Sequence, residues 1–368
     1  MRTIFIFFFI LNCLDVYSQQ ESNFPSSGVL NIKNLFSSNC DPAIACYRIP
    51  TIVTATNGDI IVAIDERVPS CSDLKWNPDI NIVIRRSVDN GDSWAPIETV
   101  VNYPIGQSAS DPSMIVDKKT GKIFLFFNFM DLENEKGVYY FKVVSSLDHG
   151  KTWSEPQDIT SQISKPNWHR DFKFITSGRG IQTQSGKLLH TIVNLEKGLH
   201  LFGSDDHGKS WFLFETPISP ADESKIVELA DGTWMINSRV NNAGIRYKHI
   251  STDQGQTWIS SPDSALIDPG CNASILNYSY MNDTNEENWI VFANAYSGKS
   301  RENLTISLSC DNGKSWSLQK SIYDGSAAYS SLSILSNGEI GLFFEANDYQ
   351  DNFFVRFNWN WLTGEREN

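Results

Sequence analysis

The octapeptide Ser87-Val-Asp-Asn-Gly-Asp-Ser-Trp94 follows a pattern, Ser-x-Asp-x-Gly-x-(Ser/Thr)-Trp, that occurs five times in the 368 residues of the chain. The other four copies occupy residues 146–153, 204–211, 251–258 and 309–316. Successive copies begin 59, 58, 47 and 58 residues apart. A motif repeated at such spacing indicates one supersecondary unit that is built several times along the chain.

Each copy, here called an Asp box, has the residues of a tight turn. Its Gly permits the positive φ that such a turn needs, and its Asp accepts hydrogen bonds from nearby backbone N–H groups. Its Trp is expected to bury its ring against the neighbouring sheet. One carboxylate per turn supplies too few ligands for Ca²⁺, so we interpret the boxes as structural elements.

Apolar strands surround the boxes. Alternating strands precede them, as at 81–85 and 304–308, and further strands lie between them, as at 121–127 and 232–236. A repeat of about 58 residues suits four short antiparallel strands, and residues 19–368 hold about six such repeats. The sequence therefore predicts an all-β fold, a six-bladed β-propeller of four-stranded antiparallel blades, as one domain over 19–368.

The N-terminus has the features of an export signal. Arg2 supplies a positive charge, residues 4–14 are nearly all apolar, and small and polar residues follow. This apolar run is too short to span a bilayer, and we identify no second candidate span. We expect a signal peptide over 1–18 and a secreted protein, in an extracellular, periplasmic or secretory-lumen location.

Charge and histidine content restrict the partners. The chain carries 30 Lys and Arg against 43 Asp and Glu, a formal net charge of −13. Nucleic-acid binding requires concentrated positive charge, so no nucleic-acid partner is expected. The six His residues form no HExxH motif or other ligand pair, so we expect no metal and no cofactor. We also expect a monomer.

The cysteine content leaves the disulfide pattern open. Of six Cys, Cys13 lies in the expected signal peptide, and the spacing of the others matches no zinc motif. One or two disulfides with at least one unpaired thiol, and burial of several Cys as small apolar residues, are both open interpretations. The Cys residues concerned are Cys40, Cys46, Cys71, Cys271 and Cys310.

Several charged residues adjoin or end apolar strands, at the places where a propeller brings distant segments to its central axis. A buried ion is costly without a partner, so these charges should meet one another or a ligand. They are Arg48, Glu223, Arg239, Arg301 and Glu345.

The segment Tyr47-Arg-Ile-Pro50, followed by the Asp boxes, resembles the exo-sialidases (neuraminidases) of cellular organisms over essentially the whole of 19–368. The boxes occur in other propellers too, whereas the Arg-Ile-Pro segment with the downstream residues is specific. The resemblance implies that three arginines, Arg48, Arg239 and Arg301, bind the carboxylate of a sialic acid. Guanidinium groups suit this role because they bind carboxylates bidentately.

The same resemblance implies roles for six further residues. These are Asp73 as acid/base, Tyr329 as nucleophile, Glu223 as the base that assists it, Glu345 as the carboxylate that orients Arg48, Arg67 as a further substrate-binding arginine, and Asp111 as a pocket-lining residue. From the residues alone, Glu228 competes with Glu223 and Asp79 competes with Asp73.

The leading hypothesis is therefore an exo-α-sialidase that hydrolyses terminal sialic acids of glycoproteins, glycolipids or oligosaccharides, with retention through a covalent tyrosyl intermediate. One alternative is a trans-sialidase, which is expected to carry an aromatic acceptor platform and a lectin-like domain after the propeller; we identify no such domain. Another is a non-enzymatic propeller that binds sialosides or peptides. That alternative should lack Tyr329 or one of the three arginines, and this sequence has all four.

Overall fold

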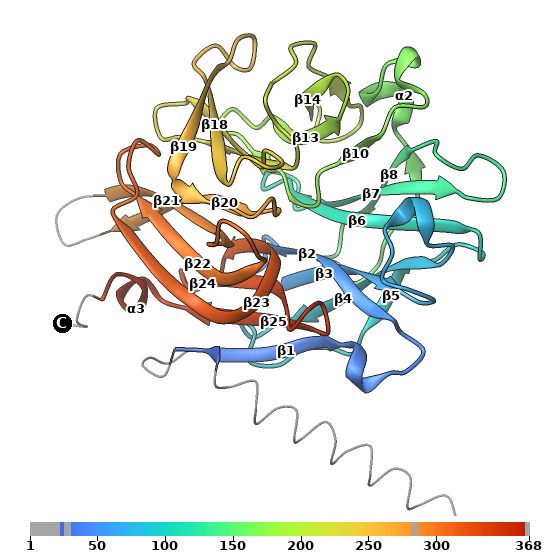
Figure 1. Ribbon diagram of the computed structural model, residues 1–368, viewed down its shortest axis with the longest axis horizontal. Helices are drawn as coiled ribbons and strands as arrows, with labels where there is room; N and C mark the ends of the chain where they lie inside the picture. The colour runs from blue at the N-terminus through green and yellow to red at the C-terminus, as the bar shows by residue number, and fades with distance from the viewer. Residues whose placement is uncertain (1–22, 26–30, 282–285, 365–368) are drawn as a thin grey trace, which may run out of the picture.

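Strands dominate residues 23–25, 31–281 and 286–364, which are the residues that the computed structural model describes (Figure 1). The expected signal peptide lies outside them. Helical segments in the described part are short: α2 (Thr160–Ile163), α3 (Trp359–Thr363) and the 3₁₀ turns η2 (Ser38–Cys40), η3 (Leu74–Trp76) and η4 (Pro166–Trp168). None of the helices in these ranges is long and apolar enough to cross a membrane.

Four sheets follow one another along the chain, each consisting mainly of antiparallel neighbours. The first holds β2 (Cys46–Thr54), β3 (Ile60–Arg67), β4 (Ile80–Ser87) and β5 (Glu98–Val101). The second holds β6 (Gln107–Val116), β7 (Ile123–Asp131), β8 (Tyr140–Ser146) and β9 (Gln157–Asp158), with β11 (Gly178–Arg179) added parallel to β6. The third holds β10 (Lys173–Ile175), β12 (Ile181–Gln182), β13 (Leu188–Asn194), β14 (Gly198–Ser204) and β15 (Phe212–Leu213). The fourth holds β16 (Ser224–Glu228), β17 (Trp234–Ser238), β18 (Ile245–Ser251) and β19 (Ile259–Ile267).

A fifth sheet has seven strands and divides naturally into two groups of four. Its strands are β20 (Ser274–Met281), β21 (Glu286–Ala295), β22 (Glu302–Ser309), β23 (Leu318–Ile334), β24 (Ile340–Ala346), β25 (Asp351–Phe357) and β1 (Asn31–Ser37). The long strand β23 pairs with β22 up to Ser326 and with β24 from Ala327 onward, so it serves both groups. The outer strand β1 pairs with β25, which joins the beginning of the described chain to its end.

The innermost strands contact one another in sequence. The neighbours are β2 with β6, β6 with β12, β12 with β16, β16 with β20, and β23 with both β20 and β2. In Figure 1 the sheets accordingly follow one another around the molecule, from blue through green to red. This all-β arrangement confirms the predicted fold class and fits a β-propeller. The four strand segments predicted from the sequence fall within, or overlap, β4, β22, β7 and β17.

Every Asp box begins at the last residue of the third strand in its group. In the first box, Ser87 Oγ accepts a hydrogen bond from Gly91 N at 2.8 Å and donates one to Asp89 at 2.7 Å. Asp89 in turn accepts from the backbone and side chain of Ser93, and these hydrogen bonds lower its pKa to about 2. The other four boxes repeat this Ser–Asp–Gly network.

The glycine of a box is also a contact point between sheets. Gly208, with φ of 74°, lies against the ring of Phe124 in the preceding sheet, and an ideal Cβ on it would stand 2.1 Å from Phe124 Cζ. Gly91 approaches Phe354 in the same way, and Trp94 of that box packs edge-on against the same ring. The boxes therefore join neighbouring sheets, as the sequence predicts.

Replacing Gly208 with Ala should destabilise the fold more than replacing Gly232. Both glycines have positive φ, so each substitution should cost about 1–2 kcal/mol of backbone strain. Only Gly208 has a close neighbour, since no atom lies within 4 Å of an ideal Cβ at Gly232. Overpacking against Phe124 should add about 1–3 kcal/mol to the loss for Gly208→Ala. Urea unfolding measures both variants, and equal losses would contradict the inter-sheet role of the box glycine.

Candidate functional site

Residues from three sheets meet at one end of the innermost strands. Arg48 lies near the start of β2, Glu223 directly precedes β16, and Tyr329 begins the inner part of β23. Arg239 directly follows β17, and Arg301 directly precedes β22. Antiparallel strands place the start of one strand beside the end of the next, so the topology brings these five side chains to one place.

Tyr329 and Glu223 form the centre of this site. The Tyr329 hydroxyl donates to Glu223 Oε2 at 2.6 Å, and Arg239 Nη1 donates to the same oxygen at 2.6 Å. Burial raises the pKa of Tyr329 well above its usual value, and the charge of Glu223 raises it further, while Arg239 and Arg301 act in the opposite direction. The phenol is therefore neutral in the resting site and already hydrogen-bonded to a carboxylate.

Three guanidinium groups surround the Tyr329 side chain. Arg239 Nη1 lies 3.4 Å from its hydroxyl, and the guanidinium carbons of Arg48 and Arg301 lie 5.6 and 5.3 Å from the ring centroid. Arg48 and Arg239 have carboxylate partners, whereas Arg301 donates to the neutral oxygens of Tyr349 and Gly270. The positive charge of Arg301 is thus available to an anionic ligand.

The Glu345 carboxylate links Arg48 to the backbone of Tyr329. Its fully buried carboxylate accepts hydrogen bonds from Arg48 Nε at 3.2 Å, Ile49 N at 2.7 Å and Tyr329 N at 3.0 Å. Ile49 has a φ of 68°, which is rare for a β-branched residue, and its N–H points to Glu345 in this conformation. One carboxylate therefore fixes both an arginine and the backbone of the tyrosine.

Asp73 lies on the loop after β3, within reach of two arginines. Its carboxylate accepts from Arg67 Nη1 at 2.8 Å, lies 3.7 Å from Arg48 Nη1, and is 77% exposed. Partial burial would raise the pKa of Asp73, but Arg67, with smaller contributions from Arg48 and Arg301, lowers it below the usual value. A solvent-accessible carboxylate beside an anion site is suited to proton transfer.

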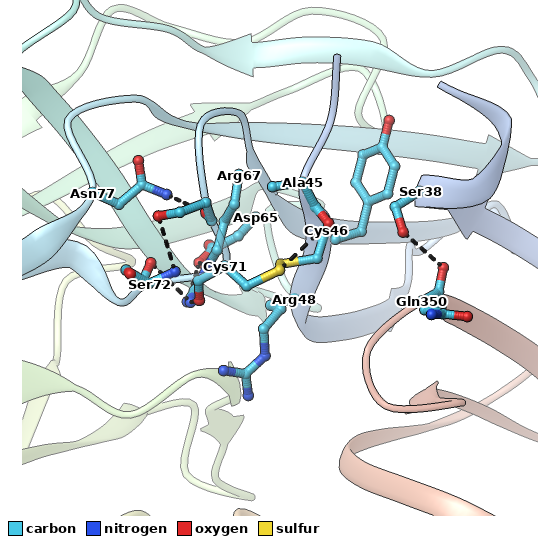
Figure 2. Close-up of a disulfide and its surroundings, with 12 residues drawn as sticks. Ser38, Ala45, Cys46, Arg48, Asp65, Arg67, Cys71, Ser72, Asn77 and Gln350 are labelled. Carbon is cyan, nitrogen blue, oxygen red and sulfur yellow. Dashed lines mark hydrogen bonds and ion pairs between the residues drawn. A yellow bond between two sulfur atoms is a disulfide. The ribbon is translucent and has the colours of Figure 1, made fainter. Parts of the chain in front are cut away.

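A disulfide ties this loop to the arginine strand. Cys46 in β2 is bonded to Cys71, two residues before Asp73, and Figure 2 shows the Arg48 side chain projecting away from the ribbon beside this bond. Cys271 is buried without a disulfide, which agrees with the expectation of at least one unpaired thiol. The disulfide limits how far the Asp73 loop can move from Arg48.

Arg67 lies buried beside the Asp73 loop. Its side chain has no exposed surface, and it donates to Asp65, Asp73 and the carbonyl oxygens of Cys71 and Ser72. These contacts position the Asp73 loop, and the buried Asp65 carboxylate, 2.9 Å from Arg67 Nη2, holds the guanidinium in place. The substrate contact of Arg67 stays a prediction.

Asp111 lies beside this buried cluster. Its backbone N–H donates to Asp65 at 3.0 Å, and its carboxylate accepts from Asn128 at 2.9 Å. Burial, followed by the charge of Asp65, raises the pKa of Asp111 to about 8. Its carboxyl is therefore mostly protonated at neutral pH and can donate a hydrogen bond, so Asp111 remains a candidate lining residue.

The carboxylates that compete for the same predicted role differ in the residues that they contact. Glu223 contacts Tyr329, whereas Glu228 ends β16 and accepts from Gln184 N. Asp79 accepts from Asn81 at 3.3 Å and forms no ion pair with an arginine in the described ranges, whereas Asp73 pairs with Arg48 and Arg67. The geometry therefore brings together Glu223 and Asp73 with the remaining predicted residues.

Sequence reasoning missed three residues of the site. Tyr349 packs under Arg48, whose guanidinium carbon lies 4.1 Å from its ring centroid, and it accepts from Arg301. Asp65 accepts hydrogen bonds from Arg67 Nε and Nη2 and so holds the Arg67 guanidinium in place. Lys225, 2% exposed, donates to Asn272 at 2.7 Å beneath Glu223. Charged residues inside otherwise apolar strands were a usable signal for Asp65 and Lys225, whereas nothing in the turn around Tyr349 indicated its role.

No group of three or more His, Cys, Asp or Glu residues in the described ranges is arranged to hold a metal ion.

Comparison with known proteins places these residues in a family context. Residues 75–342 match the model of the BNR repeat-like domain. The chain is 34% identical over 347 residues to a sialidase of Micromonospora viridifaciens, covering 86% of this chain and 52% of that protein. It thus spans about half the length of this curated relative.

Solved structures show the same fold. The Hadza microbial sialidase Hz136 has a TM-score of 0.78 at 26% identity, covering 88% of this chain and 68% of its own. A leech intramolecular trans-sialidase, solved with 2,7-anhydro-Neu5Ac, has a TM-score of 0.79 at 20% identity, covering 93% and 72%. At that identity the second likeness concerns the fold alone.

Glu345→Gln should destabilise the protein far more than Glu339→Gln. Removing a charge from a fully buried pair leaves Arg48 poorly compensated and sets an amide N–H₂ against a backbone donor, with an expected loss of about 3–5 kcal/mol. Glu339 pairs with Arg356 at 2.8 Å but is partly exposed, so its loss should be about 0–1 kcal/mol. Denaturant unfolding compares the two, and similar losses would show that Glu345 does not anchor the site.

Proposed function

The chain belongs to the BNR repeat-like family, and from this membership and the geometry of the site we propose that it is an exo-α-sialidase. The observation that carries the proposal is the Tyr329 hydroxyl, 2.6 Å from a Glu223 oxygen and surrounded by three guanidinium groups. A tyrosine nucleophile is the recognised exception to two-carboxylate glycosidases. The names of the sialidase relatives support the same class of substrate, sialylated glycans.

We also propose that the first four sheets and the two halves of the fifth sheet are six blades of a closed propeller. The contacts of each innermost strand with the next, and of β23 with β2, support this closure. The pairing of β1 with β25 would complete the last blade with a strand from the beginning of the described chain. Export through a signal peptide over 1–18 is part of the proposal and rests on the sequence alone.

Recognition would begin with the sialic acid carboxylate. Arg301, which has no carboxylate partner in the described part of the chain, would bind it together with Arg48 and Arg239. One charge pair at about 4 Å is worth about 4 kcal/mol at an effective dielectric of 20, before desolvation is subtracted. A carboxylate nucleophile would be repelled by this same substrate group, whereas the neutral phenol of Tyr329 is not.

The first chemical step would form a tyrosyl–sialosyl intermediate. The Tyr329 oxygen attacks the anomeric carbon while Glu223 accepts the phenol proton. The bond from that carbon to the glycosidic oxygen breaks, and Asp73 donates its proton to the departing oxygen. Arg239, which shares the Glu223 oxygen, stabilises the carboxylate in its ionised form before the transfer.

The second step would hydrolyse the intermediate. Asp73, now ionised, removes a proton from a water molecule that attacks the same carbon from the opposite face to Tyr329. The carbon–phenol bond breaks, and the proton on Glu223 returns to the phenolate oxygen. Two displacements at one carbon retain the anomeric configuration.

Tyr329→Phe should abolish turnover while leaving the fold intact. The phenyl ring keeps its packing under Arg48 and Arg301, so only the nucleophile is lost, and we expect kcat to fall about a thousandfold or more. Release of sialic acid from a fluorogenic α-sialoside measures this. Tyr140→Phe, which removes an exposed hydroxyl bonded to Glu135 on β8, should leave kcat unchanged.

Three outcomes would change the proposal. Unchanged turnover in Tyr329→Phe would contradict the nucleophile. A folded wild-type protein that binds sialic acid without turning over the sialoside would favour a binding propeller. Sialic acid recovered mainly on an added acceptor glycan would favour a trans-sialidase.

The pH dependence of kcat/KM, which reports the free protein, should differ from that of kcat, which reports the complex. In the free protein Asp73 has a lowered pKa, so it is ionised at neutral pH and gains its proton only as the pH falls. A bound substrate carboxylate offsets the charges of Arg48 and Arg301, which should raise the pKa of Asp73 in the complex. The alkaline limb of kcat/KM should therefore lie at lower pH than that of kcat.

Steady-state rates between acid and neutral pH test this order of the two limbs. Asp73→Asn, which cannot donate a proton, should flatten both alkaline limbs. It should also slow glycosides with poor leaving groups more than aryl sialosides. A kcat/KM that still increases above neutral pH would contradict the assignment of Asp73.

A further inference from the structure

A large cavity lies at the opposite end of the innermost strands from the Tyr329 site. This cavity, of about 1360 Å³, is lined by the last residues of β2, β6, β16 and β23, including Thr54, Val116, Glu228 and Ile334. The proposed catalytic residues Arg48 and Glu223 stand at the starting ends of β2 and β16. The far cavity is therefore distinct from the site around Tyr329.

The short strand β11 lies between this cavity and the Tyr329 site. It pairs with β6 and contacts β2 and β23, and the Thr51 hydroxyl donates to Gly178 O. An ideal Cβ on Gly178 would stand 2.8 Å from Lys225 Cε on the side of the tyrosine site. The next residue, Arg179, lines the far cavity. In β11, Gly178 therefore faces the Tyr329 site, and Arg179 faces the far cavity.

Arg179 is a cation without a compensating anion. Nη1 donates to Leu332 O at 3.0 Å, Nε is buried with no hydrogen-bond partner, and no carboxylate in the described residues lies within 4 Å of the guanidinium. Burial lowers the pKa of Arg179 to about 10, so it remains charged at neutral pH. The Arg179 side chain is half-buried, and a charge partly removed from bulk water is costly unless an anion joins it.

The other charges of the cavity wall do not neutralise Arg179. Lys118 and Lys119 also line the cavity and form no ion pair in the part of the chain that the structure describes. The lining carboxylates are Glu228, which already accepts from Gln184 N, and the exposed Glu286. Burial and the charge of Arg179 lower the pKa of Lys118, which indicates that the two cations act on each other.

We propose that this far cavity binds an oxyanion, a phosphate or carboxylate group, through Arg179 with Lys118 beside it. A guanidinium offers two parallel N–H donors to such a group, and its anionic charge would relieve the repulsion between the two cations. The cavity is large enough for a small organic molecule carrying that group. This inference does not depend on the proposed sialidase activity.

The test is calorimetric titration of inorganic phosphate and, separately, acetate into the full chain at low salt and neutral pH. The background variant Arg301→Gln weakens the competing site at Tyr329, because Arg48 and Arg239 already have carboxylate partners. Adding Arg179→Gln should weaken binding of at least one anion tenfold or more. The anion that responds identifies the group, phosphate or carboxylate.

Two controls keep the proposal open to refutation. In the otherwise unaltered chain, Arg179→Gln should leave kcat on a sialoside and the melting temperature in anion-free buffer unchanged, or raise the latter, since it removes an uncompensated charge. If that variant does not fold, Lys118→Gln in the Arg301→Gln background should still weaken binding about threefold. Equal affinity with and without Arg179, or no binding of either anion to Arg301→Gln, would overturn the proposal.

Discussion

The buried carboxylate of Glu345 is the interaction on which the geometry of the site depends. It accepts from Arg48, from the backbone of Ile49 in a left-handed conformation, and from the backbone of Tyr329. These partners come from β2 and β23, which are far apart in the sequence and adjacent in space. A single acceptor group thus sets the distance between an arginine and the tyrosine that it flanks.

Charge is distributed unevenly along the axis of the molecule. Around Tyr329, Arg48 and Arg239 pair with carboxylates, whereas Arg301 has no carboxylate partner among the described residues. Beyond β11, Arg179 and Lys118 line the far cavity and form no ion pair in that part of the chain. In a chain of net charge −13, such local positive surplus has a cost in self-repulsion and desolvation. The anion binding that we propose at each end would offset this cost.

The repeats predicted the fold because their chemistry is local. Each box closes its own turn through Ser, Asp and Gly, so its role follows from eight consecutive residues. Arg48, Tyr329 and Glu223 were predicted through motif resemblance, and the structure brings them together. Arg67 shows what resemblance does not supply: its ion pairs with the buried Asp65 and with Asp73 emerge only in the structure.

The sequence by itself determined the repeat, the all-β class and the set of charged residues that must find partners, because turns, strand periodicity and residue type act over short distances. Only the tertiary structure decided which carboxylate meets Tyr329, which arginine has no carboxylate partner among the described residues, and that β11 separates the Tyr329 site from the far cavity. Those features depend on contacts between strands hundreds of residues apart, where burial and distance, rather than residue type, set the energies.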